Sequence, residues 1–196
     1  MRELLPGLSH WSTFHAPIGA PVSSYFVAPA GVVIDPKVPE EGIDALPGTP
    51  QRVVMTTGLH DRDVPQFADA FGIPVCAPRE ARDRLGDTLA FEPFGDGDEI
   101  APGVTAIRVG SLCPDEYALH LAVGEGAIAF ADAVIRYGGR LSFVPDSLMG
   151  EDPEAVKAGL MEALHRILTR DFDHLLFAHG EPLIGGGKAA LQDFVT

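Results

Sequence analysis

The chain has 196 residues, of which 46% are hydrophobic and 21% are charged. Those fractions are ordinary for a globular protein, and the length predicts a single domain that spans residues 1–196. The 28 acidic and 14 basic residues give a formal net charge of −14. A surface of that charge repels phosphate groups, which argues against nucleic acid or an anionic membrane as a partner.

Two further features predict a cytoplasmic protein. No segment approaches the roughly 20 consecutive apolar residues that span a bilayer, and an acid and a proline interrupt residues 1–11, where a secretory signal needs an apolar core. The two cysteines, Cys76 and Cys113, have neither the number nor the spacing of a disulfide framework or a zinc knuckle. We therefore expect a reduced protein with no membrane partner, while the composition leaves its oligomeric state open.

The first half of the chain alternates short apolar runs with polar turns. Residues 24–34 predict two short strands around a Pro-Ala-Gly turn, and Asp35 with the proline after it ends the second strand. Residues 36–50 contain four prolines and are predicted to be mostly loop. A buried strand at 52–55, a polar turn, a helix closed by Gly72 and a further strand then follow. This order is typical of a βαβ crossover between parallel strands.

The second half of the chain predicts more strands, one long helix and a short terminal helix. An acid followed by a proline at 152–153 marks the start of the long helix, which is expected to extend over 153–170. Its apolar residues recur at helical spacing, and we expect the buried stripe to consist of Val156, Leu160, Leu164 and Ile167. The other expected elements are strands at 104–109, 117–123, 127–130 and 174–178, a loop over 136–152 and a helix over 188–195.

Two mixed sheets packed face to face, with helices outside, would satisfy this order of elements. In layered α/β folds, functional sites tend to lie in the loops directly after strands. Four of these loops, which we call strand exits, contain carboxylates or histidines, and we expect a site where the strand exits meet. The residues at the exits are His60, Asp61, Arg62 and Asp63; Ser111, Cys113, Asp115 and Glu116; Asp132; and His179 and Glu181.

The same exits resemble the motifs of the metallo-β-lactamase-fold superfamily over nearly all of the chain. Residues 55–62, MTTGLHDR, lie where that family has T-H-x-H-x-D-H. Residues 109–111, VGS, lie at its P-G-H motif, and 130–132, FAD, resemble its strand that ends in G-D. Residues 177–182, FAHGEP, resemble its final G-H-G. The resemblance implies an α/β fold, a four-layer αββα sandwich with metal ions at one edge between the sheets.

The sequence departs from this family at the first metal position. The resemblance implies that three histidines hold the first metal in typical members. The corresponding residues here are Thr57, Leu59 and Ser111, and none of them is a normal zinc ligand. A binuclear centre is therefore not expected.

At the second metal position, the resemblance implies that Asp61, Asp132 and His179 are retained, while Arg62 replaces a histidine. A guanidinium group between Asp61 and Asp132 would relieve their repulsion and could pair with a carboxylate. We expect Arg62 to point into the site and to pair with one of these carboxylates. If Arg62 points outward instead, His60 can turn inward, and one zinc, iron or manganese ion becomes plausible.

Two functions remain open at this point. The expected one is a metal-free protein without a cofactor, which binds a small molecule or acts as an interaction module. The alternative is a hydrolase of ester, lactone, thioester or phosphoester substrates that uses a single metal or an altered mechanism. The sequence does not identify the substrate and leaves open whether the protein is an enzyme.

The candidate residues follow from the strand exits and the resemblance. The candidate catalytic residues are His60, Asp61, Asp132 and His179, of which Asp61, Asp132 and His179 are the metal ligands if a single metal is bound. The candidate substrate-pocket residues are Arg62, Ser111 and Cys113. The Cys113 thiol could act as a nucleophile or a soft ligand, but it has no base beside it in sequence, so buried packing is the simpler interpretation. Near the N-terminus, His10, Trp11 and His15 either border a pocket or pack against the fold.

Overall fold

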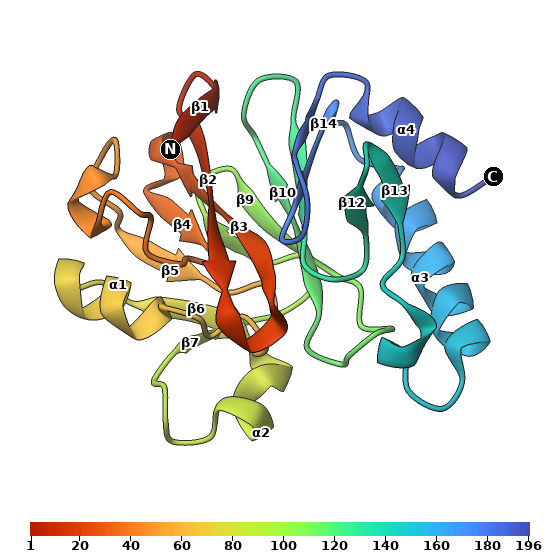
Figure 1. Cartoon of the computed structure of the whole chain (residues 1–196), viewed down its shortest axis with the longest axis horizontal. Coiled ribbons are helices and arrows are strands. Elements are labelled where there is room, and N and C mark those ends of the chain that lie inside the picture. Colours follow the sequence, from red (N-terminus) through yellow and green to blue (C-terminus); the bar gives the residue numbers. More distant parts are fainter.

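A computed structural model describes residues 1–196 and contains two large sheets that face each other, with helices on both outer sides (Figure 1). The first sheet has seven strands, whose spatial order is the same as their order in the sequence. The second sheet has six strands in the order β15-β14-β11-β10-β9-β8. This architecture confirms the predicted αββα sandwich.

The first sheet combines an antiparallel half with a parallel half. Its first four strands pair antiparallel, and its last four pair parallel, so that β4 belongs to both halves. The parallel half contains the predicted βαβ unit, in which α1 (Val64–Phe71) connects β5 to β6. The strands are β1 (Arg2–Leu5), β2 (Leu8–His15), β3 (Ala20–Val27), β4 (Val32–Ile34), β5 (Arg52–Val54), β6 (Val75–Pro78) and β7 (Glu92–Phe94).

The second sheet is antiparallel except where β14 pairs parallel with β11. This parallel pair forms because α3 (Pro153–Ile167) lies between the two strands in the sequence and returns the chain to the end of the sheet at which β11 begins. The strands are β8 (Glu99–Ala101), β9 (Val104–Arg108), β10 (Tyr117–Leu121), β11 (Ala127–Phe130), β14 (His174–Phe177) and β15 (Leu183–Ile184).

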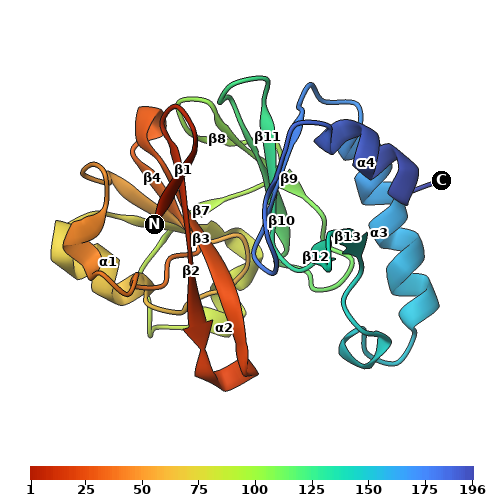
Figure 2. The same ribbon diagram turned by 45° about the horizontal axis from the view of Figure 1, so that its top comes forward.

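Alternating side chains give each sheet two buried faces. In the first sheet, Ile34 and Val54 point toward the second sheet, whereas their neighbours Val33 and Val53 pack with Phe67 of α1 on the outer side. Figure 2 shows α1 and α2 (Arg82–Leu85) on that side of the molecule, and α3 and α4 (Gly187–Phe194) on the opposite side. The four layers therefore follow from the period-two pattern of buried strands covered by amphipathic helices.

The buried stripe of α3 is largely as predicted. Leu160, Leu164 and Ile167 are completely buried against the second sheet, and Val156 packs against the same core while half-buried. The helix begins after Asp152, whose side chain accepts a hydrogen bond from the Ala155 N–H as an N-cap. The longest helix has 15 residues, and none of the helices is both long and apolar enough to cross a bilayer.

The predicted loop over 136–152 is wrong in its first part. Residues 135–142 form a hairpin of β12 (Ile135–Tyr137) and β13 (Arg140–Ser142). Gly138 and Gly139 form its turn with φ angles of 54° and 80°, a conformation that favours glycine. The Gly-Gly pair was the signal for this hairpin, because short strands on either side of such a pair are typical of a tight turn.

Pairing of parallel strands places the candidate residues at one edge of the molecule. Ile34 of β4 pairs with Val54 of β5, and Phe130 of β11 pairs with Phe177 of β14. Parallel strands that end in register present the loops after them at the same edge. The loops after these four strands therefore meet between the two sheets.

Candidate functional site

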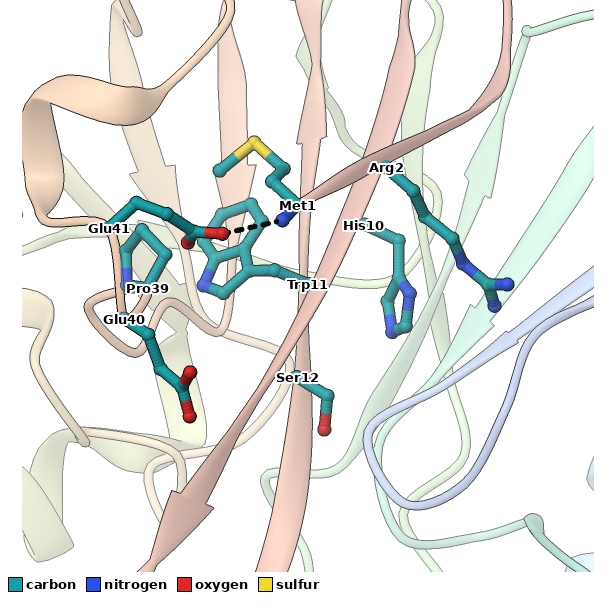
Figure 3. A pocket seen from close by; sticks show the side chains of 8 residues that line it. All are labelled: Met1, Arg2, His10, Trp11, Ser12, Pro39, Glu40 and Glu41. Atoms are coloured by element: carbon teal, nitrogen blue, oxygen red, sulfur yellow. Dashed lines mark hydrogen bonds and ion pairs between the residues drawn. The ribbon is translucent and has the colours of Figure 1, made fainter.

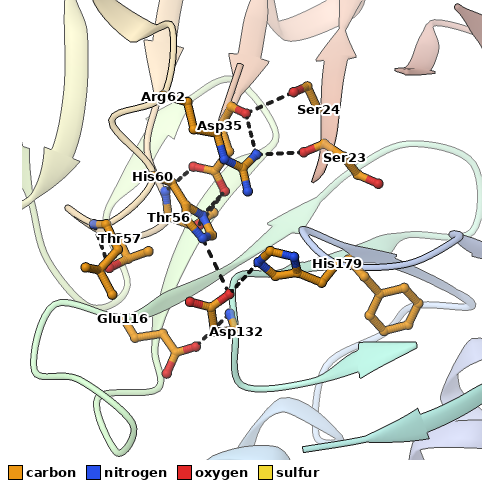
Figure 4. A network of polar contacts seen from close by, with 12 residues as sticks. Ser23, Ser24, Asp35, Thr56, Thr57, His60, Arg62, Glu116, Asp132 and His179 are labelled. Atoms are coloured by element: carbon orange, nitrogen blue, oxygen red, sulfur yellow. Dashed lines mark hydrogen bonds and ion pairs between the residues drawn. The ribbon is translucent and has the colours of Figure 1, made fainter. Parts of the chain in front are cut away.

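Three side chains from three of these loops converge in the structure (Figure 4). Nε2 of His60 lies 3.4 Å from Oδ1 of Asp132, and Nε2 of His179 lies 3.0 Å from the same oxygen. One nitrogen or oxygen atom from each of the three residues lies within 4.8 Å of the other two. The cluster therefore joins the loop after β5 in the first sheet to the loops after β11 and β14 in the second sheet.

Asp35 fixes the orientation of the His60 ring. It follows β4 directly and has a φ of 43°, a backbone conformation that is uncommon outside glycine. Its carboxylate accepts hydrogen bonds from the backbone N–H and the hydroxyl of Thr56, and its Oδ2 lies 2.9 Å from Nδ1 of His60. Because Nδ1 faces this buried carboxylate, Nε2 is directed toward Asp132.

The charges of His60 and Asp132 stabilise each other. Burial and the nearby Arg62 oppose protonation of His60, but Asp35 and Asp132 outweigh them and raise the pKa of His60 to about 9. Burial also disfavours the Asp132 carboxylate, yet His60 and His179 hold the pKa of Asp132 well below its ordinary value. The cluster thus contains an ionised carboxylate between two imidazoles.

Asp132 also has an acidic neighbour, Glu116, which is completely buried. Oε1 of Glu116 accepts a hydrogen bond of 3.0 Å from the backbone N–H of Asp132. Burial and the charge of Asp132 raise the pKa of Glu116 to about 8. Glu116 therefore supports the loop that presents Asp132, a role that the sequence analysis did not assign to it.

Asp61 lies outside the cluster, which corrects its predicted role as a metal ligand. Its side chain is exposed, and its Oδ1 accepts a hydrogen bond from the backbone N–H of Arg62. His60 occupies the inward position instead. This shift in register follows from the preceding turn, in which the His60 N–H bonds to the Thr57 carbonyl and Asp115 accepts from Thr57 and Gly58.

Arg62 points inward as predicted, but the predicted pairing with a carboxylate of Asp61 or Asp132 is wrong. Its Nη1 donates to the carbonyls of Ser23 at 2.9 Å and Asp35 at 2.8 Å. These buried carbonyls need donors, and they take both hydrogen bonds of Nη1. The guanidinium group therefore belongs to the wall of the site and does not substitute for a ligand of Asp132.

Two adjoining cavities open onto the cluster. The larger, of about 470 Å³, is lined mainly by apolar side chains, and the smaller, of about 210 Å³, contains His60 and Arg62 in its wall. The residues that line both cavities are Ile18, Leu59, Asp132 and His179. The large hydrophobic side chains that are exposed at the larger cavity are Ile18, Leu59, Tyr137 and Leu148. The cluster therefore lies at the junction of an apolar and a polar space.

The remaining pocket candidates differ in their placement. Cys113 lines the larger cavity, but burial, with Glu116 and Asp115, raises the pKa of its thiol to about 12. Such a thiol is a poor nucleophile at neutral pH. Ser111 does not line either cavity, because it packs against α3, where a Cβ on Gly159 would lie 2.6 Å from its Oγ. The prediction of Ser111 as a pocket residue is therefore wrong.

The residues near the N-terminus divide between two places. His10 and Trp11 line a polar cavity of about 330 Å³ together with Met1, Arg2 and Glu41 (Figure 3). That cavity shares no lining residue with the two cavities at the cluster. His15, in contrast, lines the smaller cavity beside Arg62.

The facing sheets, the outer helices and the edge site together define the metallo-β-lactamase fold. A metallo-β-lactamase from Hirschia baltica superposes on this chain with a TM-score of 0.68 and 13% identity, over 99% of this chain and 94% of that chain. A metallo-β-lactamase family protein from Thermus thermophilus gives a TM-score of 0.66 and 17% identity, over 98% and 79% of the two chains. A variant of the flavo-di-iron protein from Thermotoga maritima superposes with a TM-score of 0.67 and 15% identity, over 96% of this chain and 57% of that chain.

No family model and no curated protein sequence matches the chain. At identities of 13–17%, the structural likeness shows the fold alone. The chemistry of the site must therefore be argued from the residues of this chain.

Proposed function

We propose that the chain is a hydrolase that holds one divalent metal ion with His60, Asp132 and His179. One observation carries this proposal. Oδ1 of Asp132 is buried without an aligned hydrogen bond, although two imidazole nitrogens lie 3.0 and 3.4 Å from it. Buried carboxylate oxygens are rarely left without a partner, and a cation shared by the three groups would provide one.

The residues present fit such an ion. Two imidazole nitrogens and one carboxylate oxygen are donors that suit zinc, iron or manganese. Three protein ligands leave a position free, as catalytic metal sites require. The contact of Asp35 with Nδ1 of His60 is the kind of outer contact that orients a ligating histidine. The structural neighbours include metallo-β-lactamases and a flavo-di-iron protein, which supports a metal without choosing which.

A metal at this position would supply a Lewis acid and a water of lowered pKa. The chain itself provides the substrate pocket. Its apolar walls, which include Leu59, Tyr137 and Leu148, would hold the apolar part of a small substrate and exclude water from the cluster. Ester, lactone, thioester and phosphoester bonds are the candidates, because each has an oxygen that a metal can polarise.

A metal-free binding protein is the second candidate, and one observation favours it. The pKa of His60, raised by Asp35 and Asp132 against burial, lies at about 9, so a protonated His60 neutralises the Asp132 carboxylate at neutral pH. In that state, the cluster is stable without a metal, and the cavities serve only to bind a small molecule.

Elemental analysis of protein purified without chelator distinguishes the two candidates. The hydrolase requires about one metal ion per chain, a rise in the melting temperature when metal is restored after chelation, and metal-dependent turnover of an aryl ester or thioester. His179→Gln should abolish the metal and the turnover, whereas the matched control His165→Gln, on the exposed side of α3, should change neither. No bound metal, together with no thermal shift on adding zinc, iron or manganese, would support the metal-free protein.

A further inference from the structure

Two polar groups in the wall of the smaller cavity have no role in the cluster. Nη2 of Arg62 and Nδ1 of His15 are buried, and neither has a hydrogen-bond partner in the structure. Both residues line the smaller cavity. Since buried donors and acceptors are nearly always satisfied in folded proteins, two unsatisfied groups in one cavity wall indicate a missing partner there.

The guanidinium group of Arg62 is held in a fixed orientation. Its Nη1 donates to the carbonyls of Ser23 and Asp35, so the side chain cannot turn away without breaking two partly buried hydrogen bonds. The two N–H groups on Nη2 remain free. Figure 4 shows this guanidinium with its bonds to Ser23 and Asp35.

No carboxylate bonds directly to the Arg62 guanidinium, although the charge of Asp35 acts on it. The Asp35 carboxylate is occupied by Thr56 and His60, and the Asp132 carboxylate faces His60 and His179. The carboxylate of Asp61 is exposed and bonds to the backbone of Arg62 itself. A buried guanidinium whose Nη2 has no hydrogen-bond partner is costly, and a ligand anion bonded to Nη2 would offset that cost.

We propose that Arg62 and His15 bind the carboxylate of a small monoanionic ligand whose apolar body lies in the larger cavity. A carboxylate matches the unpartnered polar atoms of Arg62 and His15, whereas a dianion would bring excess charge next to Asp35 and Asp132. The two cavities share Ile18 and Leu59 in their walls, so one molecule can reach both. The larger cavity is mostly apolar, which suits an aryl or alkyl group.

His15 complements this arrangement as a neutral donor. Burial lowers its pKa, and the charges of Lys37 and Arg62 lower it further. A neutral imidazole with the proton on Nδ1 can donate one hydrogen bond to a carboxylate oxygen. The inference takes the substrate pocket from the proposed function but does not need the metal.

The test uses the intact chain after removal of metal with chelator. Phenylacetate, phenylpropanoate and phenylbutanoate, each with its primary amide, are titrated by calorimetry. At least one acid should bind about tenfold or more tightly than its amide, since a hydrogen bond to a charged partner is worth this factor. Equal binding of acids and amides, or no binding of any acid at millimolar concentration, would overturn the proposal. This wild-type comparison does not depend on whether a variant folds.

Variants then locate the anion site. Arg62→Gln should remove the preference for the acid, and His15→Phe should reduce it, while Arg79→Gln should leave it unchanged, because Arg79 is exposed and lines neither cavity. An acid preference that persists in Arg62→Gln would contradict the assignment. Because the titrations are metal-free, failure of metal binding in the earlier test and failure of acid binding here are distinguishable.

Discussion

Nε2 of His60 and Oδ1 of Asp132 lie 3.4 Å apart although they belong to opposite sheets of the sandwich. His60 follows β5 of the first sheet, and Asp132 follows β11 of the second. Their contact therefore depends on how the two sheets pack, and the core between the sheets sets the geometry of the site. Tyr25 illustrates this dependence, because its buried hydroxyl in the first sheet bonds to the backbone of Phe177 in the second.

The first prediction concerns Asp35 as a positioning residue. In Asp35→Asn, the amide can keep an oxygen toward Thr56 but places an N–H group toward Nδ1 of His60. The tautomer that directs a free Nε2 at the cluster is then no longer favoured. On the proposed function, zinc affinity measured by competition with a chromophoric chelator should fall by about 10–100-fold.

Asp63→Asn is the matched control for this experiment. The carboxylate of Asp63, which is half-buried, also accepts a backbone N–H, from Val38, but it is not part of the cluster. The zinc affinity of Asp63→Asn should match that of the wild type. An unchanged affinity in a folded Asp35→Asn variant would remove Asp35 from the positioning role.

Strand exits were predictable from the sequence because buried strands end in polar residues. Asp132 and His179 each come directly after an apolar run, two residues beyond the end of a strand, and both lie in the cluster as the pattern indicated. The same signal was present at Asp35, which directly follows a buried strand, but its contact with His60 is set by a backbone conformation that periodicity does not reveal.

The turn before His60 limited what the sequence could show. A shift of one residue decides whether His60 or Asp61 points inward. The hydrogen bonds that Asp115 accepts from Thr57 and Gly58 fix that register. Arg62 was predicted to pair with a carboxylate, yet its hydrogen bonds go to the backbone carbonyls of Ser23 and Asp35. Both outcomes depend on long-range contacts that local pattern does not encode.

The second prediction tests the packing of α3 on the second sheet. Leu164 is completely buried, so Leu164→Ala should leave a cavity and lower the free energy of unfolding by about 2–5 kcal/mol. Glu162→Ala lies on the exposed face of the same helix and should change it by less than about 0.5 kcal/mol. Urea denaturation of both variants measures the difference. Equal stabilities would place Leu164 outside the core.

The third prediction concerns the reactivity of Cys113. Burial, Glu116 and Asp115 raise the pKa of its thiol to about 12, so little thiolate is present at neutral pH. In a Cys76→Ser background, alkylation of the native protein by iodoacetamide should be much slower than that of the urea-unfolded chain, and should accelerate only in strong base. Fast labelling of the native protein at neutral pH would show an activated thiol instead.

The last prediction concerns the pH dependence of stability through His10. This side chain is 4% exposed, and its Nε2 lies 3.0 Å from the hydroxyl of Ser23. Burial lowers the pKa of His10 from 6.5 to about 4, with Arg2 contributing in the same direction and Glu181 opposing. The unfolded chain therefore binds more protons than the folded chain between these two values. The contribution of His10 to stability is fully present above pH 6.5 and is lost as the pH falls toward 4.

The expected loss over this window is about 3 kcal/mol, because each unit of pKa difference corresponds to about 1.4 kcal/mol. Carboxylates titrate in the same range, so the comparison needs a variant that removes only this group. In His10→Gln, the amide can still contact Ser23 but does not titrate. Urea denaturation at about pH 7.5 and about pH 4.5 should therefore show a smaller loss of stability for His10→Gln than for the wild type, whereas the exposed control His165→Gln should behave like the wild type. If the wild type and His10→Gln lose stability equally on acidification, His10 is not the residue whose protonation destabilises the fold.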